Sequence, residues 1–266
     1  MRAKHAPGTQ EDRFAAYIEN LAQAAGHLDR HEPLRAYCKG LLLPIERKSV
    51  EPMAARLAPD NVRQMHQSMH HLVADAPWED EILLAKVREQ VLPAMIRQSP
   101  VEAWVIDDTG FPKQGRHSVG VARQYCGQLG KQDNCQVAVS LSVANRQASL
   151  PVAWRLYLPA EWAADRARRR QAQVPEDIAF ATKPEIALEQ LRWACAAGLP
   201  RGVVLLDAGY GNNSALRSGM TALDLSYVAG ILPTTTVWAP GTAPLPPKRW
   251  SGRGRRPGRL RGVGQH

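Results

Sequence analysis

Apolar side chains recur at helical spacing through the first hundred residues of the chain. The segment after Asp60 has them at positions 62, 65, 69 and 72, and the segment after Asp80 at 82, 87, 91, 95 and 96. Each spacing predicts an amphipathic helix capped by the preceding aspartate, and Pro93 is expected to kink or shorten the second one. Residues 11–99 are therefore predicted to form a small helical N-terminal domain.

After Pro100 the pattern changes to that of strands. Residues 102–108 are a short apolar run that ends in two aspartates. Residues 135–143 alternate, with apolar side chains at positions 137, 139, 141 and 143 on one face. Residues 117–126 and 149–158 are also strand-like. Short connections between adjacent strands favour an antiparallel meander.

Helices return after these strands. Residues 160–173 and 184–197 are predicted to be helical, and the apolar run 202–206 to be a strand, with a further helix and strand after it. This order predicts an α/β fold over residues 100–232, in which helices flank a mixed sheet. Residues 233–266 are rich in proline, glycine and arginine, a composition that predicts a flexible tail.

The positive charge of the chain is concentrated near its end. The formal net charge is +9 and the isoelectric point is near 9.7. From position 248 onward there are seven basic residues and no acidic one. This excess indicates a polyanionic partner such as nucleic acid, although such a tail can also serve only to keep a protein in solution.

The sequence gives no sign of export or of a membrane partner. It contains no run of about eighteen apolar residues, and its polar N-terminus lacks the apolar core of a secretory signal. The four cysteines form no C-x-x-C pair, which is typical of reduced thiols. We therefore expect a cytoplasmic protein.

Two carboxylate sites stand out, because each follows a short apolar strand and precedes a turn that contains glycine. Asp107 and Asp108 follow the first strand, and Asp207 follows the strand at 202–206. Ligands of open α/β sheets bind beyond the carboxyl ends of the strands. Magnesium prefers one or two carboxylates together with phosphate oxygens. Each aspartate alone is equally compatible with a helix cap or a turn.

Several stretches resemble bacterial insertion-sequence transposases of the DDE superfamily. They are residues 106–115 (IDDTGFPKQG), 117–127 (HSVGVARQYCG) and 205–211 (LLDAGYG), with weaker similarity at 47–52 (RKSVEP) and 74–78 (ADAPW). The resemblance spans about residues 12–261, and the DDTGFPK block is its most specific part. It implies an RNase H-like fold, dependence on Mg²⁺ or Mn²⁺, binding of transposon ends and target DNA, and strand cleavage followed by strand transfer.

The resemblance also implies roles for the three aspartates. Asp108 and Asp207 are expected to be catalytic metal ligands, with Asp107 as the alternative to Asp108. Successive strand residues point to opposite faces, so only one of the two neighbours is expected to reach a shared ion. The family's Asp-Thr pair favours Asp108, which leaves Asp107 a turn or supporting role.

The family's third carboxylate is a glutamate on a helix well after the second aspartate. No glutamate follows Glu189 in this sequence, and Asp224 is too close to Asp207. We therefore expect a C-terminally truncated transposase that is inactive, or nearly so. The alternative is a non-catalytic DNA-binding remnant, or a regulator of full-length transposase. The protein partner to test is a second copy of the chain or a full-length transposase. Within the cytoplasm, the chain is expected to associate with the nucleoid.

Basic residues in two regions are candidates for binding the DNA backbone. Lys113, Arg116 and Arg123 follow the first aspartate pair, where a solvated edge strand is the simpler interpretation. The tail contributes Arg253, Arg255 and Arg256, in a stretch that resembles flexible arms along DNA. The N-terminal helical domain is also expected to bind DNA.

Overall fold

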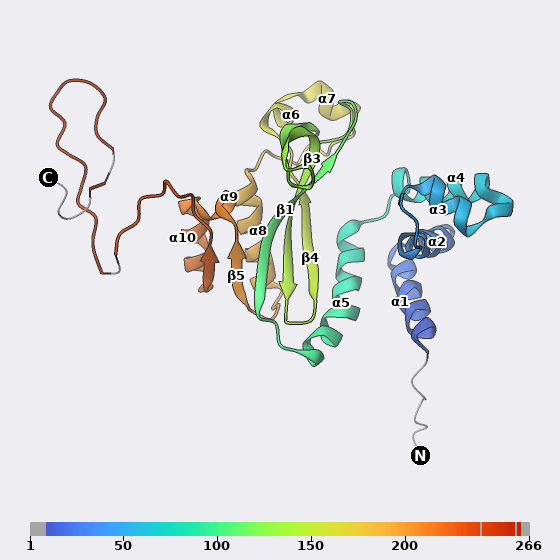
Figure 1. The fold of residues 1–266 in the computed structure, drawn as a ribbon. Coiled ribbons are helices and arrows are strands. Elements are labelled where there is room, and N and C mark those ends of the chain that lie inside the picture. The colour runs from blue at the N-terminus through green and yellow to red at the C-terminus, as the bar shows by residue number, and fades with distance from the viewer. Residues whose placement is uncertain (1–8, 240, 259, 262–266) are drawn as a thin grey trace, which may run out of the picture.

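The computed structural model describes residues 9–239, 241–258 and 260–261. Five α-helices precede the sheet in this part of the chain: α1 (Gln10–Ala24), α2 (His31–Leu42), α3 (Val50–Leu57), α4 (Val62–Ala74) and α5 (Asp80–Gln98). Figure 1 shows α5 running along one edge of the sheet, with α1–α4 gathered on its far side. Short 3-10 turns at Leu28–Arg30 and Pro59–Asn61 connect these helices.

The helices before α5 have a small core of their own. Met53 and Met69, from α3 and α4, are fully buried there. Gly40 of α2 lies so close that a Cβ atom at this position would stand 2.8 Å from the sulfur of Met53. By contrast, Leu92 and Met95 of α5 belong to the core of the sheet. The proposed division into domains at residues 99 and 232 stays a prediction.

The strands form one mixed sheet in the order β2-β3-β1-β5-β6, and β4 pairs with β3 beside β2. Their bounds are β1 Ala103–Pro112, β2 Ala122–Cys126, β3 Lys131–Ala144, β4 Ser149–Leu156, β5 Val203–Leu206 and β6 Tyr227–Ala229. A 3-10 turn at Gly127–Leu129 joins β2 to β3. The long strand β3 is antiparallel to β1, β2 and β4, whereas β5 and β6 are parallel to β1.

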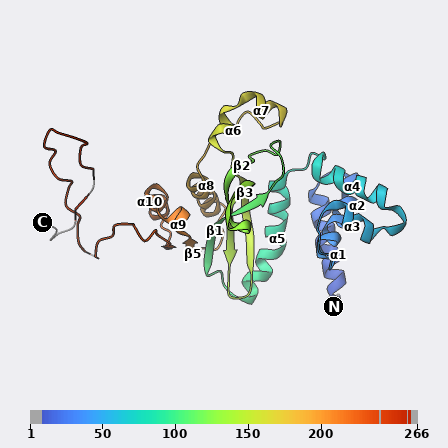
Figure 2. The same cartoon turned by 45° about the horizontal axis from the view of Figure 1, so that its top comes forward.

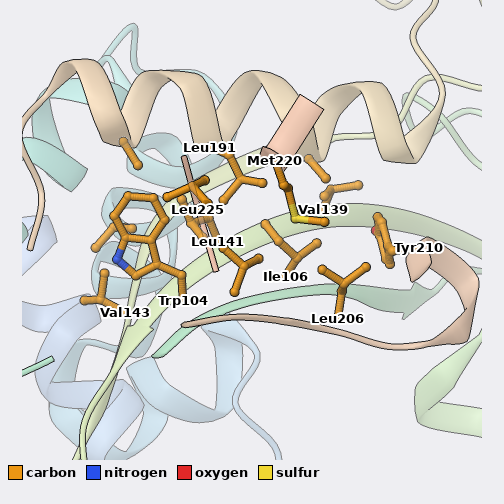
Figure 3. Packing of buried hydrophobic residues seen from close by; sticks show 14 of the residues in the cluster. Trp104, Ile106, Val139, Leu141, Val143, Leu191, Leu206, Tyr210, Met220 and Leu225 are labelled. Atoms are coloured by element: carbon orange, nitrogen blue, oxygen red, sulfur yellow. The ribbon is translucent and has the colours of Figure 1, made fainter. Parts of the chain in front are cut away.

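One face of this sheet carries the main core, and helices α8 (Lys183–Ala196) and α10 (Ser214–Ala222) cover it. Trp104 and Ile106 of β1 point to this face and are buried, as are their neighbours on β3 and β5. Figure 3 shows Leu191 of α8 and Met220 of α10 packed over them. On the other face Val203, Leu205 and Val228 remain exposed.

A separate small core forms around Trp162 near the end of the sheet. Trp162 lies on α6 (Ala160–Ala164), is fully buried, and donates its indole N–H to the carbonyl oxygen of Val121 at 2.8 Å. The next helix, α7 (Arg166–Gln171), begins after Asp165, whose carboxylate accepts the N–H of Arg168. Figure 2 shows α6 and α7 projecting beyond the strands on the β2 side.

Several local predictions about the helices were wrong. Asp60 does not cap α4, which begins after Asn61, and Asp80 is the first residue of α5. Pro93 does not shorten α5, which continues to Gln98 because Leu92 and Met95 are buried and hold the helix on the sheet, and the alternative of a kink stays a prediction. The helix predicted at 160–173 is two short helices, since the Asp165 side chain starts a new one.

The strand predictions erred mainly in their bounds. The first strand continues past the aspartates to Pro112, because β3 pairs with it along its whole length. Residues 117–121 form turns, and only 122–126 are paired. In the described part of residues 233–261 there is no helix or named strand, only a bridge between Leu245 and Arg261. No helix in the described chain is long and apolar enough to cross a membrane.

The core of the sheet supplies the first prediction. Leu141 on β3 is fully buried, whereas Leu156 on β4 is 39% exposed. We expect Leu141→Ala to lower the free energy of unfolding by roughly 2–5 kcal/mol, because it leaves a cavity beneath α8. Leu156→Ala, the matched control, should cost less than about 1 kcal/mol. Urea denaturation followed by circular dichroism measures both, and equal losses would contradict the placement of the core.

Candidate active site

The carboxyl ends of β1 and β5 open into a cleft of about 840 Å³. The register of the parallel pair places Ile106 opposite Leu206, so the aspartates that follow these residues meet at the same edge of the sheet. The lining residues are Asp107, Asp108, Thr109, Gly110, Tyr125, Gly127, Gln128, Tyr157, Lys183, Pro184, Asp207, Gly209 and Tyr210. All three aspartates that the sequence singled out therefore line one cleft at this edge of the sheet.

The two neighbouring aspartates of β1 lie in different surroundings. Asp108 continues the face of Trp104 and Ile106, so it lies at the end of the main core, with a side chain only 22% exposed. Asp107 lies on the opposite face and is exposed. Its carboxylate accepts the N–H of Asp108 at 2.7 Å. The bond holds the Asp107 carboxylate against its own backbone, and the assignment of Asp107 to a turn or supporting role stays a prediction.

Asp108 is held by two side chains from distant parts of the sequence. The ammonium of Lys183, in the first turn of α8, lies 2.7 Å from Oδ2 of Asp108. The hydroxyl of Tyr210 donates to the same oxygen at 3.4 Å. Burial, and then the negative charge of Asp108, raises the pKa of Tyr210 well above its usual range. The phenol thus remains a donor at neutral pH.

Asp207 is both part of the cleft and a helix cap. It precedes the short helix α9 (Ala208–Gly211), and its Oδ1 accepts the backbone N–H groups of Gly209 at 2.9 Å and Tyr210 at 3.2 Å. The capping role, one of the two interpretations of this aspartate, is thus realised in the structure. Both bonds use Oδ1, and they fix the carboxylate at the rim of the cleft.

The basic residues singled out in the sequence are not among those that line the cleft. Lys113 and Arg116 lie in the loop after β1, and Arg123 lies exposed on β2. In the C-terminal segment Arg253 and Arg255 are exposed, and Arg256 stacks on Trp250 with 5.0 Å between the guanidinium carbon and the ring centre. Among the described residues, the cation that lines the cleft is Lys183.

Sequence reasoning missed Lys183 and Tyr210. The stretch Thr182-Lys183-Pro184-Glu185 shows only a helix start, and the structure confirms that Thr182 and Glu185 form a capping box. Lys183 is 75 residues from Asp108 in sequence, so no local pattern connects them. Tyr210 is three residues after Asp207, but its direction toward Asp108 depends on the turn at α9.

The cleft offers hard oxygen ligands from adjacent strands. Among the described residues, no three histidine, cysteine, aspartate or glutamate side chains are gathered closely enough to hold a metal ion by themselves. Magnesium does not require such a cage, because it is commonly held by one or two carboxylates, water and substrate phosphate. The chemistry of Asp108 and Asp207 fits an ion whose coordination a phosphate completes.

The antiparallel strands on one side of β1 and the parallel strands on the other, under helices, make this an RNase H-like α/β fold. Residues 20–266 match the family model described as DDE superfamily endonuclease. The chain therefore belongs to that family, and the predicted fold class is confirmed. It is also 30% identical over 193 residues to a probable transposase for insertion sequence element IS701 from Microchaete diplosiphon. That match covers 72% of this chain and 46% of the relative.

The raised pKa of Tyr210 predicts a pH effect on stability. An unfolded tyrosine ionises near pH 10, whereas folded Tyr210 stays neutral, so stability present below pH 10 is lost as the pH rises above it. Between pH 8 and 10.5 this loss is on the order of 1 kcal/mol. Tyr210→Phe should remove it from the pH profile of urea denaturation. Tyr125→Phe, which changes an exposed tyrosine of the same cleft, should leave this pH effect in place. Identical pH profiles for all three proteins would contradict this placement of Tyr210.

Proposed function

We propose that this chain is part of a DDE-type transposase, which binds transposon-end DNA and holds a divalent cation between Asp108 and Asp207. The observation that supports it most directly is the convergence of the carboxylates on one cleft in a chain of this family. The chain spans about half the length of the curated relative that it matches, so the activity of a whole transposase belongs to the proposal.

In this proposal, the three aspartates of the cleft and the groups that hold them have defined tasks. Asp108 and Asp207 supply oxygen ligands, and Asp107 fixes the backbone at Asp108 by accepting its N–H. A bound Mg²⁺ or Mn²⁺ would activate water or a 3′-hydroxyl and stabilise the charge on the phosphate. The α9 amides hold Asp207 in place, and Tyr210 orients Asp108, so both carboxylates are positioned before DNA arrives.

We further propose that residues 1–266 by themselves cleave DNA poorly. Two aspartates could hold one ion together with phosphate, but a second ion would lack a protein anchor. In the described residues Asp224 is not among those that line the cleft. The same observation favours a second candidate function, a non-catalytic DNA-binding regulator that pairs with another copy or a full-length transposase.

DNA binding is proposed to involve surfaces outside the cleft. Arg116 lies against α7, where the guanidinium of Arg168 donates to the carbonyl oxygen of Arg116 at 2.6 Å, and Lys113 lies in the same loop after β1. Arg166 and Arg170 of the same helix line a neighbouring cavity of about 390 Å³. Together they form a basic end of the molecule that suits a phosphate backbone. The N-terminal helices and the C-terminal arginines are proposed to extend this contact.

The metal-binding part of the proposal is tested by calorimetric titration of the purified chain with Mn²⁺. Asp108→Asn and Asp207→Asn are expected to weaken binding at least about ten-fold each, because each removes a negatively charged ligand. Asp165→Asn is the matched control, since Asp165 also caps a helix but lies outside the cleft. Mn²⁺ binding that is unaffected by both cleft substitutions would exclude the proposed site.

The same proteins distinguish the two candidate functions. Supercoiled plasmid incubated with Mg²⁺ or Mn²⁺ is expected to stay largely uncut by residues 1–266, while fluorescence anisotropy reports binding of duplex DNA. Robust cleavage that Asp207→Ala abolishes would show that the proposed inactivity is wrong. Cleavage by this chain and full-length transposase together, and by neither protein alone, would support a partnered complex.

The contribution of the C-terminal segment to DNA binding is measured by the salt dependence of the affinity. Replacing residues 248–266 by a glycine-serine segment of equal length removes seven basic residues and keeps the chain length. The slope of log K against log salt should fall by roughly 0.9 for each DNA phosphate that the altered protein no longer neutralises. An unchanged slope would show that the segment does not bind the DNA.

A further inference from the structure

The ion pair between Lys183 and Asp108 is the least exposed of those in the described residues, with side chains 27% and 22% exposed. It joins the start of α8 to the first aspartate strand across 75 residues of sequence. Both partners line the cleft with Asp207. The ammonium of Lys183 is therefore paired with Asp108, a carboxylate that the proposed function assigns as a metal ligand.

The helix itself does not require a lysine at this position. Thr182 and Glu185 already cap α8 through reciprocal hydrogen bonds. A cation in the first turn of a helix is unfavourable, because the helix dipole is positive at that end. The contact with Asp108 offsets this repulsion, and so the site, and not helix formation, accounts for the lysine.

The surroundings allow the ammonium to leave Asp108 without leaving the cleft. A lysine ammonium is a point charge on a flexible four-carbon stem. The ammonium of Lys183 also lies 5.8 Å from the ring centre of Tyr157, which lines the cleft. The hydroxyl of Tyr210 stays on Asp108 Oδ2 and can keep the carboxylate oriented. The basic side chain and the carboxylate are thus separable.

We propose that Lys183 is a positioning residue with two alternating partners, an inference that rests on the proposed function. In the free protein its ammonium occupies Asp108 and opposes the binding of a divalent cation there. When DNA enters, the ammonium moves to a non-bridging phosphate oxygen and releases the carboxylate. Metal and DNA then bind cooperatively, since each favours the state in which the ion pair is open.

The test is the affinity for Mn²⁺, measured by calorimetry with and without a DNA duplex. Without DNA, Lys183→Met is expected to bind Mn²⁺ roughly ten-fold more tightly than the natural protein, because Asp108 is no longer neutralised. DNA should raise the Mn²⁺ affinity of the natural protein, and raise it less in Lys183→Met. Lys183→Arg keeps the charge and should retain the weak Mn²⁺ binding of the natural chain.

The matched control is Lys86→Met. Lys86 forms an ion pair of the same 2.7 Å length with Glu89 on α5, outside the cleft, so its loss should leave Mn²⁺ affinity unchanged. Thermal unfolding of each variant identifies any loss of fold. Lys183→Met that is folded but binds Mn²⁺ no more tightly than the natural protein would overturn the inference.

The outcomes separate this inference from the function on which it rests. If Asp108→Asn abolishes Mn²⁺ binding and Lys183→Met does not change it, the metal site stands and the role of Lys183 is wrong. If Mn²⁺ binding is independent of Asp108 and Asp207, or absent even in Lys183→Met, both are overturned. Should Lys183→Met be too unstable to purify, Lys183→Gln, a shorter polar replacement, supplies the same comparison of affinities.

Discussion

The parallel register of β5 against β1 is the constraint on which the site depends. Ile106 lies opposite Leu206, and both strands are held there by burial against α8 and α10. Because of this register, both strands end at the same edge of the sheet. The aspartates that follow cannot separate without breaking strand pairing or exposing the core, so the negative charge of the cleft is sustained by hydrophobic packing beneath it.

Such a concentration of carboxylates needs local compensation. Asp207 obtains it from two backbone N–H groups, and Asp108 from an ammonium and a phenol. The compensation differs in kind, since the amides are fixed by α9 whereas a lysine side chain can move. One carboxylate is consequently held by backbone N–H groups, and the other by the side chains of Lys183 and Tyr210.

The exposure of the second face of the sheet at β5 and β6 is a further consequence of this layout. In the described residues α8 and α10 cover the face of Trp104, while Leu205 and Val228 face away from them and remain exposed. Asp107 lies on this open face. The chain thus combines a well-packed face, which carries Asp108, with a second face on which Asp107, Leu205 and Val228 are exposed.

The sequence by itself determined the elements and the chemistry that follows them. The order of strand-like and helical segments predicted the mixed sheet, and the Asp after each short apolar run, together with the family resemblance, singled out the three aspartates that line the cleft, because strand period and residue type are local properties. Tertiary structure decided what lies across the cleft. Lys183 reaches Asp108 only because α8 packs on the sheet, and Pro93 stays inside α5 only because Leu92 and Met95 are buried. Contacts between residues far apart in sequence are set by packing, which no local pattern records.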